Sequence, residues 1–272
     1  MRVCFATTSK KYSEILLDLG VKNILVSYLE KKLINIIKEH NVNLIIDSGA
    51  YSAWTRGVKI DIDEYISFCK SIEQDNKLNE LYFINLDIIP GNFGHIPNEE
   101  DIEKAATKGW QNYEKMKASG LSVMHIFHQH EDFKWLHKLM NEDSDYIGIS
   151  PANDLSRKKR LVWLRKVFNI VRDKKKTHGF GVTSSYILKN IPFYSADSTN
   201  WVTLVRYGLI MVHDKFKCRL LRYKRLEDAL EIGLPYKCLS ENKELVKELK
   251  KPILDTMRLE KDLNNLWKTR GL

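Results

Sequence analysis

Hydrophobic residues gather in eight short runs that alternate with longer amphipathic stretches. The runs are rich in β-branched and aromatic residues, and several are apolar at nearly every position. This pattern is typical of parallel strands that are buried on both faces. It predicts strands at residues 3–7, 24–28, 44–48, 82–88, 123–128, 146–150, 177–182 and 193–197.

The stretches between the runs predict helices. Segment 98–119 begins with Asn98 and three acidic residues and ends before Gly120, which are signals for the start and the end of a helix. The connections after the first and seventh runs are short, so single-turn helices are expected there. Eight strand–helix units predict an α/β protein of the (β/α)8 (TIM) barrel type, with its active site at the C-terminal ends of the strands. A doubly wound open sheet is the competing architecture, but it needs a reversal of strand order for which the sequence gives no signal.

A long stretch follows the eighth run. We expect residues 1–208 to form the barrel and residues 209–272 to form a short basic C-terminal extension, largely α-helical, packed on the barrel. Within the extension the pattern predicts two helices, at 241–250 and 253–268, because Pro252 between them interrupts helical hydrogen bonding.

Composition and charge indicate which partners and which cellular compartment to expect. The chain has 44 Lys and Arg against 35 Asp and Glu, a net charge of +9, which favours polyanionic partners. Its four cysteines (Cys4, Cys69, Cys218 and Cys238) are far apart, so neither a disulfide framework nor a zinc cluster is expected. No apolar run is long enough to span a bilayer, and the N-terminus lacks a signal-peptide pattern. We therefore expect a cytoplasmic protein with no membrane association.

Three aspartates, Asp47, Asp87 and Asp197, lie at the last or second-to-last residue of a predicted strand. One aspartate after a strand is commonly a helix cap or a turn former. Three at one barrel rim favour chemistry, because neighbouring carboxylates acquire different pKa values and take different roles. In glycosyl transfer one carboxylate attacks the anomeric carbon while a second group handles the proton.

The motifs at these strand ends resemble one family. Residues 47–52 (D-S-G-A-Y-S) resemble the D-S-G-[GA]-F-[QS] signature of the tRNA-guanine transglycosylases. The match is closer to their small phage and bacterial relatives, which insert 7-deazaguanine bases into DNA. Asp87, the strand at 146–149, the glycine turn at 179–182 and the segment 192–201 follow in the order of that family. The resemblance covers the whole predicted barrel.

The resemblance implies a mechanism without metal or ATP. Asp197 would attack C1′ of a guanosine and expel guanine, and Asp47 would deprotonate the incoming 7-deazaguanine base, which then displaces Asp197. Residues implied or expected to contact the base are Ser48, Gly49, Asp87, Gln129, Gly148 and His128. Tyr51, Trp54 and Phe180 are candidates to sandwich an extruded base.

Departures from the family also carry information. The tRNA enzymes have a C-x-C-x2-C…H zinc site after the last strand, whereas this chain has only Cys218 and Cys238 there, so we expect no structural zinc and no other cofactor. The chain also lacks long tRNA-gripping insertions. DNA is therefore favoured over tRNA as the substrate, with the same chemistry on tRNA as the alternative. A homodimer or an accessory protein is compatible with the family.

A basic segment follows the last predicted strand. It contains Lys215, Lys217, Arg219, Arg222, Lys224 and Arg225. It reads either as a solvated face or as a track for a phosphate backbone beside the barrel mouth. Two further alternatives remain: a barrel that binds nucleic acid or a base without chemistry, and a small-molecule enzyme that cradles phosphate in the loop at 179–185. A metal site at His125, His128, His130 and Glu131 is less favoured, because strand alternation leaves only two histidines on one side.

Overall fold

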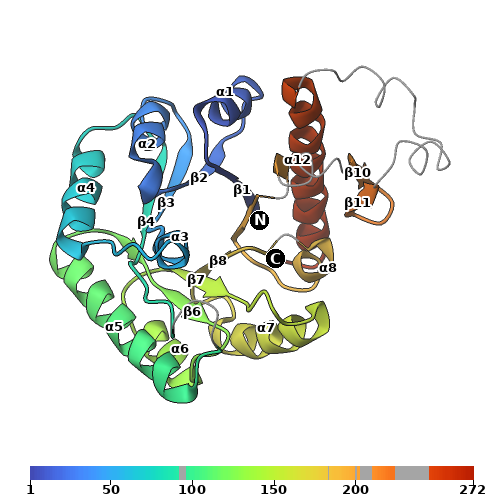
Figure 1. The fold of residues 1–272 in the computed structure, drawn as a ribbon. Helices are drawn as coiled ribbons and strands as arrows, with labels where there is room; N and C mark the ends of the chain where they lie inside the picture. The colour runs from blue at the N-terminus through green and yellow to red at the C-terminus, as the bar shows by residue number, and fades with distance from the viewer. Residues whose placement is uncertain (92–95, 183, 200, 203–209, 224–244) are drawn as a thin grey trace.

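The structure, a computed structural model, describes residues 1–91, 96–182, 184–199, 201–202, 210–223 and 245–272. Nine parallel strands form one sheet in the order β5-β4-β3-β2-β1-β9-β8-β7-β6. The strands are β1 (Arg2–Thr7), β2 (Asn23–Ser27), β3 (Asn43–Asp47), β4 (Glu80–Ile84), β5 (Val123–Met124), β6 (Ile126–His128), β7 (Tyr146–Ser150), β8 (Lys176–Gly179) and β9 (Ser195–Ser198). Only His125 separates β5 from β6, so the two ends of the sheet meet in one interrupted strand (Figure 1). The predicted (β/α)8 barrel is confirmed.

Two strands end earlier than their patterns predict. The fourth was expected at 82–88 and the seventh at 177–182, but β4 ends at Ile84 and β8 ends at Gly179. Gly181 adopts a positive φ of 62°, which takes the chain out of the extended conformation. Residues 85–88 and 180–182 therefore belong to the loops at the mouth of the barrel.

Helices cover the outside of the sheet. They are α1 (Lys10–Asp18), the 3-10 turn η1 (Tyr28–Glu30), α2 (Lys31–Ile37), α3 (Ala50–Thr55), α4 (Ile62–Gln74), α5 (Glu99–Ala118), α6 (Phe133–Met140), α7 (Arg157–Val171) and α8 (Ser185–Leu188). Helix α5 starts where predicted, because Asn98 and Asp101 cap its first turn reciprocally. The seventh connection is a single turn, as expected, whereas the first holds a helix of nine residues. No helix within the described ranges combines the length and the apolarity needed to cross a membrane.

Strand alternation builds two cores. On β1, Val3 and Phe5 pack outward against the helices, while Cys4 and Ala6 face the interior of the barrel. The interior cluster also contains Leu25, Ile45, Ile84, Met124, Ile126 and Tyr146. Filled layers of this kind make the barrel a packed scaffold rather than a pore, so reactive groups can gather only at its ends.

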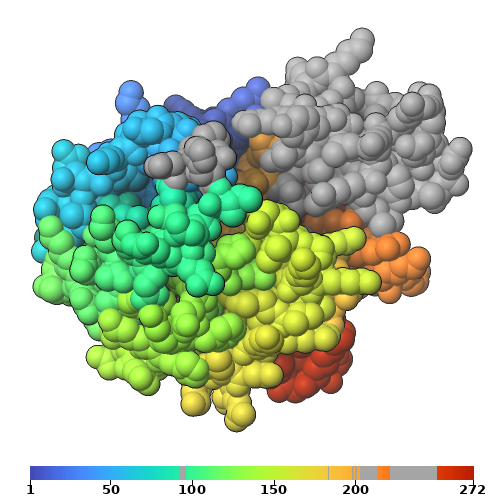
Figure 2. All heavy atoms as spheres, turned by 60° about the horizontal axis from the view of Figure 1, so that its bottom comes forward, coloured from blue at the N-terminus to red at the C-terminus, as the bar shows by residue number. Residues whose placement is uncertain are grey.

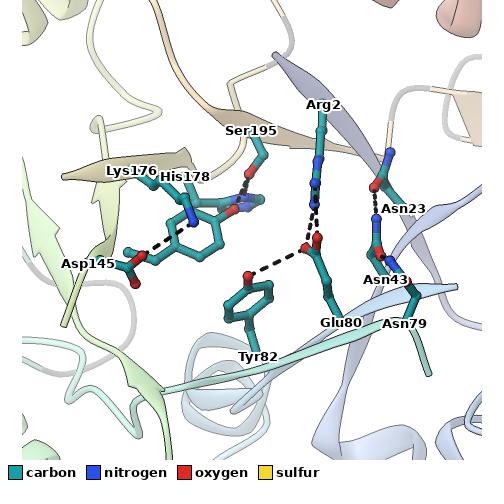
Figure 3. A network of polar contacts seen from close by, with 11 residues as sticks. Arg2, Asn23, Asn43, Asn79, Glu80, Tyr82, Asp145, Lys176, His178 and Ser195 are labelled. Carbon is teal, nitrogen blue, oxygen red and sulfur yellow. Dashed lines mark hydrogen bonds and ion pairs between the residues drawn. The ribbon is translucent and has the colours of Figure 1, made fainter. Parts of the chain in front are cut away.

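Polar contacts hold the N-terminal end of the barrel (Figure 3). Arg2 on β1 forms an ion pair with Glu80 on β4, and the hydroxyl of Tyr82 donates to the same carboxylate at 3.4 Å. Asn43 links its neighbours Asn23 and Asn79 through side-chain amides at 2.8 and 2.7 Å. These contacts fix this end of the barrel, opposite the end at which the three aspartates lie.

The C-terminal region differs from the prediction. One helix, α12 (Leu245–Thr269), replaces the two expected helices and runs through Pro252. The helix persists because Ile253, Leu259 and Leu263 are buried in the outer core, which outweighs the hydrogen bond missing at proline. Residues 241–244 of the first expected helix lie outside the described residues.

Helix α12 lies beside α1 and contacts β1 (Figure 1), and the indole of Trp267 donates to the carbonyl of Leu188, the last residue of α8. It therefore completes the outer ring of helices between α8 and α1. A hairpin of β10 (Ile210–Asp214) and β11 (Arg219–Tyr223) packs against its outer side. The boundary expected at residue 208 stays a prediction.

Candidate active site at the barrel mouth

Three carboxylates converge at the C-terminal ends of the strands. Asp47 is the last residue of β3, Asp197 lies on β9, and Asp87 follows β4 by three residues. The negative charges of Asp87 and Asp197 both raise the pKa of Asp47, which shows that the three side chains share one electrostatic environment. The structure thus brings together the aspartates that the sequence singled out.

Asp47 is about half protonated near neutral pH, because its pKa lies close to that pH. Burial raises the pKa of Asp47 to about 7, and the two neighbouring carboxylates add to this rise. One bond opposes it, because the backbone N–H of Gly49 donates to Oδ1 of Asp47 at 2.6 Å. A carboxyl with a pKa near the pH of the cell can both give and take a proton.

The turn after Asp47 requires a glycine for reasons of packing. Gly49 has a φ of 78°, and a Cβ there would lie 2.7 Å from Oγ of Ser27 and 2.9 Å from Leu29. The neighbouring Ser48 is buried. The structure therefore accounts for Gly49 and Ser48 by their places in this turn. Their contact with a base stays a prediction. Tyr51, on the helix that follows, is 64% exposed.

Asp197 is oriented through one of its oxygens. The backbone N–H of Gly181 donates to Oδ1 at 2.7 Å, and Nε2 of His178 lies 3.5 Å from the same oxygen. The side chain of Asp197 is 12% exposed. Within the described residues, both contacts of this carboxylate fall on Oδ1 and none on Oδ2.

Asp87 pairs with His128. Oδ2 of Asp87 lies 3.0 Å from Nε2 of His128, and Glu131 accepts a hydrogen bond from the backbone N–H of His128. Burial opposes a charge on the imidazole, but the hydrogen bond with Asp87 and the charges of Glu131 and Asp87 outweigh it and raise the pKa of His128 to about 9. The mouth thus presents a carboxylate beside an imidazolium, a pairing that the sequence did not predict.

Gly148 and Gln129, the two other residues expected to contact the base, make contacts within the protein itself. A Cβ on Gly148 would lie 2.6 Å from the ring of Phe180 and 2.9 Å from Ile126, so this glycine makes room for the phenyl ring. The side-chain carbonyl of Gln129 accepts the backbone N–H of Ala152 at 3.0 Å and so holds the loop after β7. The role of both residues in base binding stays a prediction.

The basic segment is only partly described. Lys215 and Lys217 are exposed at the turn of the hairpin, which is seen in orange on the right-hand side of Figure 2. The carbonyl of Lys217 accepts a hydrogen bond from Lys189 beside α8, and Arg219 pairs with Asp214. The side chain of Arg222 and the whole of Lys224 and Arg225 lie outside the described residues. These contacts place the hairpin turn on the flank of the barrel, beside α8.

Within the ranges that the structure describes, no group of three or more His, Cys, Asp and Glu side chains is arranged to hold a metal ion. Cys218 is a free thiol, and Cys238 lies outside those ranges. The expected lack of a structural zinc stays a prediction.

Sequence reasoning missed the group behind Asp197. The side chain of His178 is fully buried, and its ring lies between the carboxylate and Ser195. Ser195 also contacts the hydroxyl of Tyr146. The period of two along β9 could have placed Ser195 and Asp197 on one face, but not opposite His178.

Comparisons with known proteins support the fold. No family model and no curated protein matches the chain. A solved structure of L-ribulose 3-epimerase matches with a TM-score of 0.51 and 11% identity over 99% of this chain and 96% of that one. A Coccidioides immitis protein described as a fructose-1,6-biphosphate aldolase matches with a TM-score of 0.51 and 10% identity over 97% and 91%. The chain is therefore a (β/α)8-barrel protein, and its resemblance to the transglycosylases rests on the motifs alone.

Proposed function

We propose that this protein is an enzyme, a guanine transglycosylase that replaces a guanine in DNA by a 7-deazaguanine base through a covalent glycosyl-enzyme intermediate. The observation that carries the proposal is a pair of carboxyl groups with different environments. Asp47 has its pKa raised to about 7 by burial, while Asp197 is held through Oδ1 by a backbone N–H. Two carboxyl groups in unlike environments suit a proton carrier and a nucleophile.

The proposed reaction has two steps. Oδ2 of Asp197 forms a bond to C1′ of the nucleoside, and the bond from C1′ to N9 breaks, with its electron pair and a proton from Asp47 going to guanine. The incoming 7-deazaguanine then gives its N9 proton to Asp47 and attacks C1′. The ester bond breaks and its electron pair returns to Asp197. Two inversions give retention at C1′, and no other reactant is needed.

Asp87 and His128 are the groups proposed to recognise the base. A carboxylate accepts two hydrogen bonds, which matches the N1–H and amino group of guanine, and an imidazolium donates, which matches the carbonyl. The two groups lie 3.0 Å apart with side chains 12% and 30% exposed, so both reach the mouth. An adenine presents the opposite pattern at these positions and would be rejected.

DNA is the proposed polymer. The net charge of +9 and the exposed lysines of the hairpin favour a polyanion, and the zinc motif of the tRNA enzymes is missing from the sequence. A flipped or single-stranded nucleotide is needed, because C1′ and the base edge are not accessible together within a duplex. A second copy of the chain or an accessory protein would fit a requirement for strand opening.

The test is a covalent trap. Purified protein is incubated with guanine-containing single-stranded DNA, duplex DNA or tRNA, denatured, and examined for a protein–nucleic acid adduct. Exchange of labelled guanine is measured in parallel. We expect an adduct on DNA that is absent from Asp197→Asn. The matched control is Asp145→Asn. Asp145 lies just before β7, at the other end of the barrel, and pairs with Lys176. This variant should keep wild-type exchange.

An adduct on tRNA alone would replace DNA by tRNA as the substrate. A wild-type protein that forms no adduct and exchanges no base with any of the three polymers would refute the proposal.

A further inference from the structure

A chain of three buried polar side chains lies behind Asp197, on three neighbouring strands. Oγ of Ser195 on β9 contacts both the hydroxyl of Tyr146 on β7 and Nδ1 of His178 on β8. Figure 3 shows Ser195 against the ring of His178. All three side chains are almost completely buried. Buried polar groups are costly unless their hydrogen bonds are satisfied, so the direction of each bond is constrained.

One arrangement of protons pairs all three groups. Burial raises the pKa of Tyr146 well above its usual value, so its hydroxyl keeps its proton and can donate it to Ser195. The hydroxyl proton of Ser195 is then free for Nδ1 of His178. A neutral imidazole that accepts at Nδ1 carries its own proton on Nε2.

Nε2 of His178 faces the proposed nucleophile. It is buried, lies 3.5 Å from Oδ1 of Asp197, and makes no hydrogen bond within the described part of the chain. Contacts of this kind are often long without substrate and tighten when it binds. Oδ1 already accepts the N–H of Gly181.

We propose that His178 is a positioning residue that, through a relay from Tyr146 and Ser195, donates from Nε2 to Oδ1 of Asp197 and reserves Oδ2 for attack on C1′. The inference rests on the proposed function and deepens it. His178 does not touch the sugar or the base and transfers no proton. It fixes which oxygen reacts and how the carboxylate is turned.

The imidazole of His178 is fully buried among its neighbours. The ring centroid of Phe180 lies 4.5 Å from that of the imidazole, in an edge-to-face arrangement. Cys4 on β1 lies opposite Asp197 in the strand register. Burial raises the pKa of the Cys4 thiol, so this neighbour adds no charge. Burial of the imidazole strengthens the hydrogen bonds that it makes.

The relay acts unequally on the two steps. Donors at Oδ1 stabilise the carboxylate charge, which disappears when Asp197 attacks C1′ and returns when the 7-deazaguanine displaces it. Losing the donor therefore makes Asp197 a poorer leaving group, so breakdown of the covalent intermediate slows more than its formation. Accumulation of the intermediate is the signature that distinguishes the relay from a purely structural role.

The test uses near-isosteric variants of the full chain. Ser195→Ala and Tyr146→Phe remove one hydroxyl each, and His178→Gln replaces the donor. We expect base exchange to fall about tenfold in Ser195→Ala, and the fraction of protein trapped as adduct to rise above that of wild type. Tyr82→Phe is the matched control, because its ring packs against Tyr146 but its hydroxyl contacts Glu80 and not the relay.

Melting temperatures separate folding from function. Nitrogen NMR of the wild-type protein reports the tautomer of His178, and the relay requires the proton on Nε2. A proton on Nδ1 would overturn the inference. The inference would also be overturned if the variants matched wild type in both base exchange and adduct fraction. The same holds if both quantities fell together in proportion to the folded fraction. These results refute the relay while wild-type exchange stands, whereas a wild-type protein without adduct or exchange refutes the proposed function itself.

Discussion

The carboxyl of Asp47 holds its proton to about pH 7 in the folded chain, because it is buried near two other carboxylates. In the unfolded chain an aspartate loses its proton near about pH 3.9. Between these values the folded state binds more protons than the unfolded state. The stability contributed by this proton is therefore complete below the unfolded pKa and is lost as the pH rises through about 7.

Asp47→Asn removes this dependence and separates stability from activity. We expect the variant to be more stable than wild type at pH 8 by about 1–3 kcal/mol, to differ little at pH 4, and to lose base exchange. The measurement is the difference in melting temperature between variant and wild type at each pH. His128, with its pKa raised to about 9, also loses stability at higher pH, but it does so in both proteins and cancels in the difference.

Asp145→Asn supplies the control for this measurement. Its side chain is 75% exposed, so its offset from wild type should be the same at pH 4 and pH 8. An Asp47→Asn variant that is no more stable than wild type at pH 8 would contradict the raised pKa.

At the scale of elements, the strands and their order were predictable because apolar runs and connection lengths fix them locally. The gathering of Asp47, Asp87 and Asp197 was predictable too, since the carboxyl ends of parallel strands meet at one rim. The contact of His178 with Asp197 was not, because it depends on the register in which His178 lies opposite Ser195. Helix α12 was missed because its burial overrides the local effect of proline.

Two carboxylates of helix α12, Asp255 and Asp262, contact His213 of the hairpin, and the buried Asp255 gives a test of the region. Asp255 is almost fully buried and accepts from Lys251 at 2.6 Å, from Arg258 at 2.8 Å and from the backbone N–H of His213 at 3.3 Å. Asp255→Ala leaves these donors without their acceptor. We expect the free energy of unfolding to fall by about 2 kcal/mol, less than the roughly 3–5 kcal/mol of a fully buried pair, because Lys251 and Arg258 are partly exposed. Chemical denaturation measures it.

Asp255→Asn is the graded comparison. It keeps one oxygen as an acceptor, so its loss should be smaller than that of Asp255→Ala. An alanine variant that unfolds at the wild-type denaturant concentration would show that the hairpin and α12 are held by other contacts.

For the whole molecule, the open question is whether the net charge of +9 acts through one surface or through all of it. The lysines at the hairpin turn lie on one flank, beside α8, whereas helices α2 and α4 lie on the opposite side of the barrel (Figure 1). A phosphate track would concentrate contacts on the hairpin side. Each lysine that neutralises a phosphate contributes to the salt dependence of binding, because it releases a counterion.

Replacing Lys215 and Lys217 by Gln therefore tests the track. If both neutralise phosphates, the slope of log affinity against log salt should fall by about 1.4 for single-stranded DNA, which is about 0.7 for each lysine replaced. Arg219 is left intact because it pairs with Asp214 and supports the turn. The matched control replaces Lys32 on α2 and Lys70 on α4, which are also exposed and carry the same total charge. Equal changes of slope in the two double variants would show diffuse attraction, and the hairpin would then lose its assignment as the nucleic-acid surface.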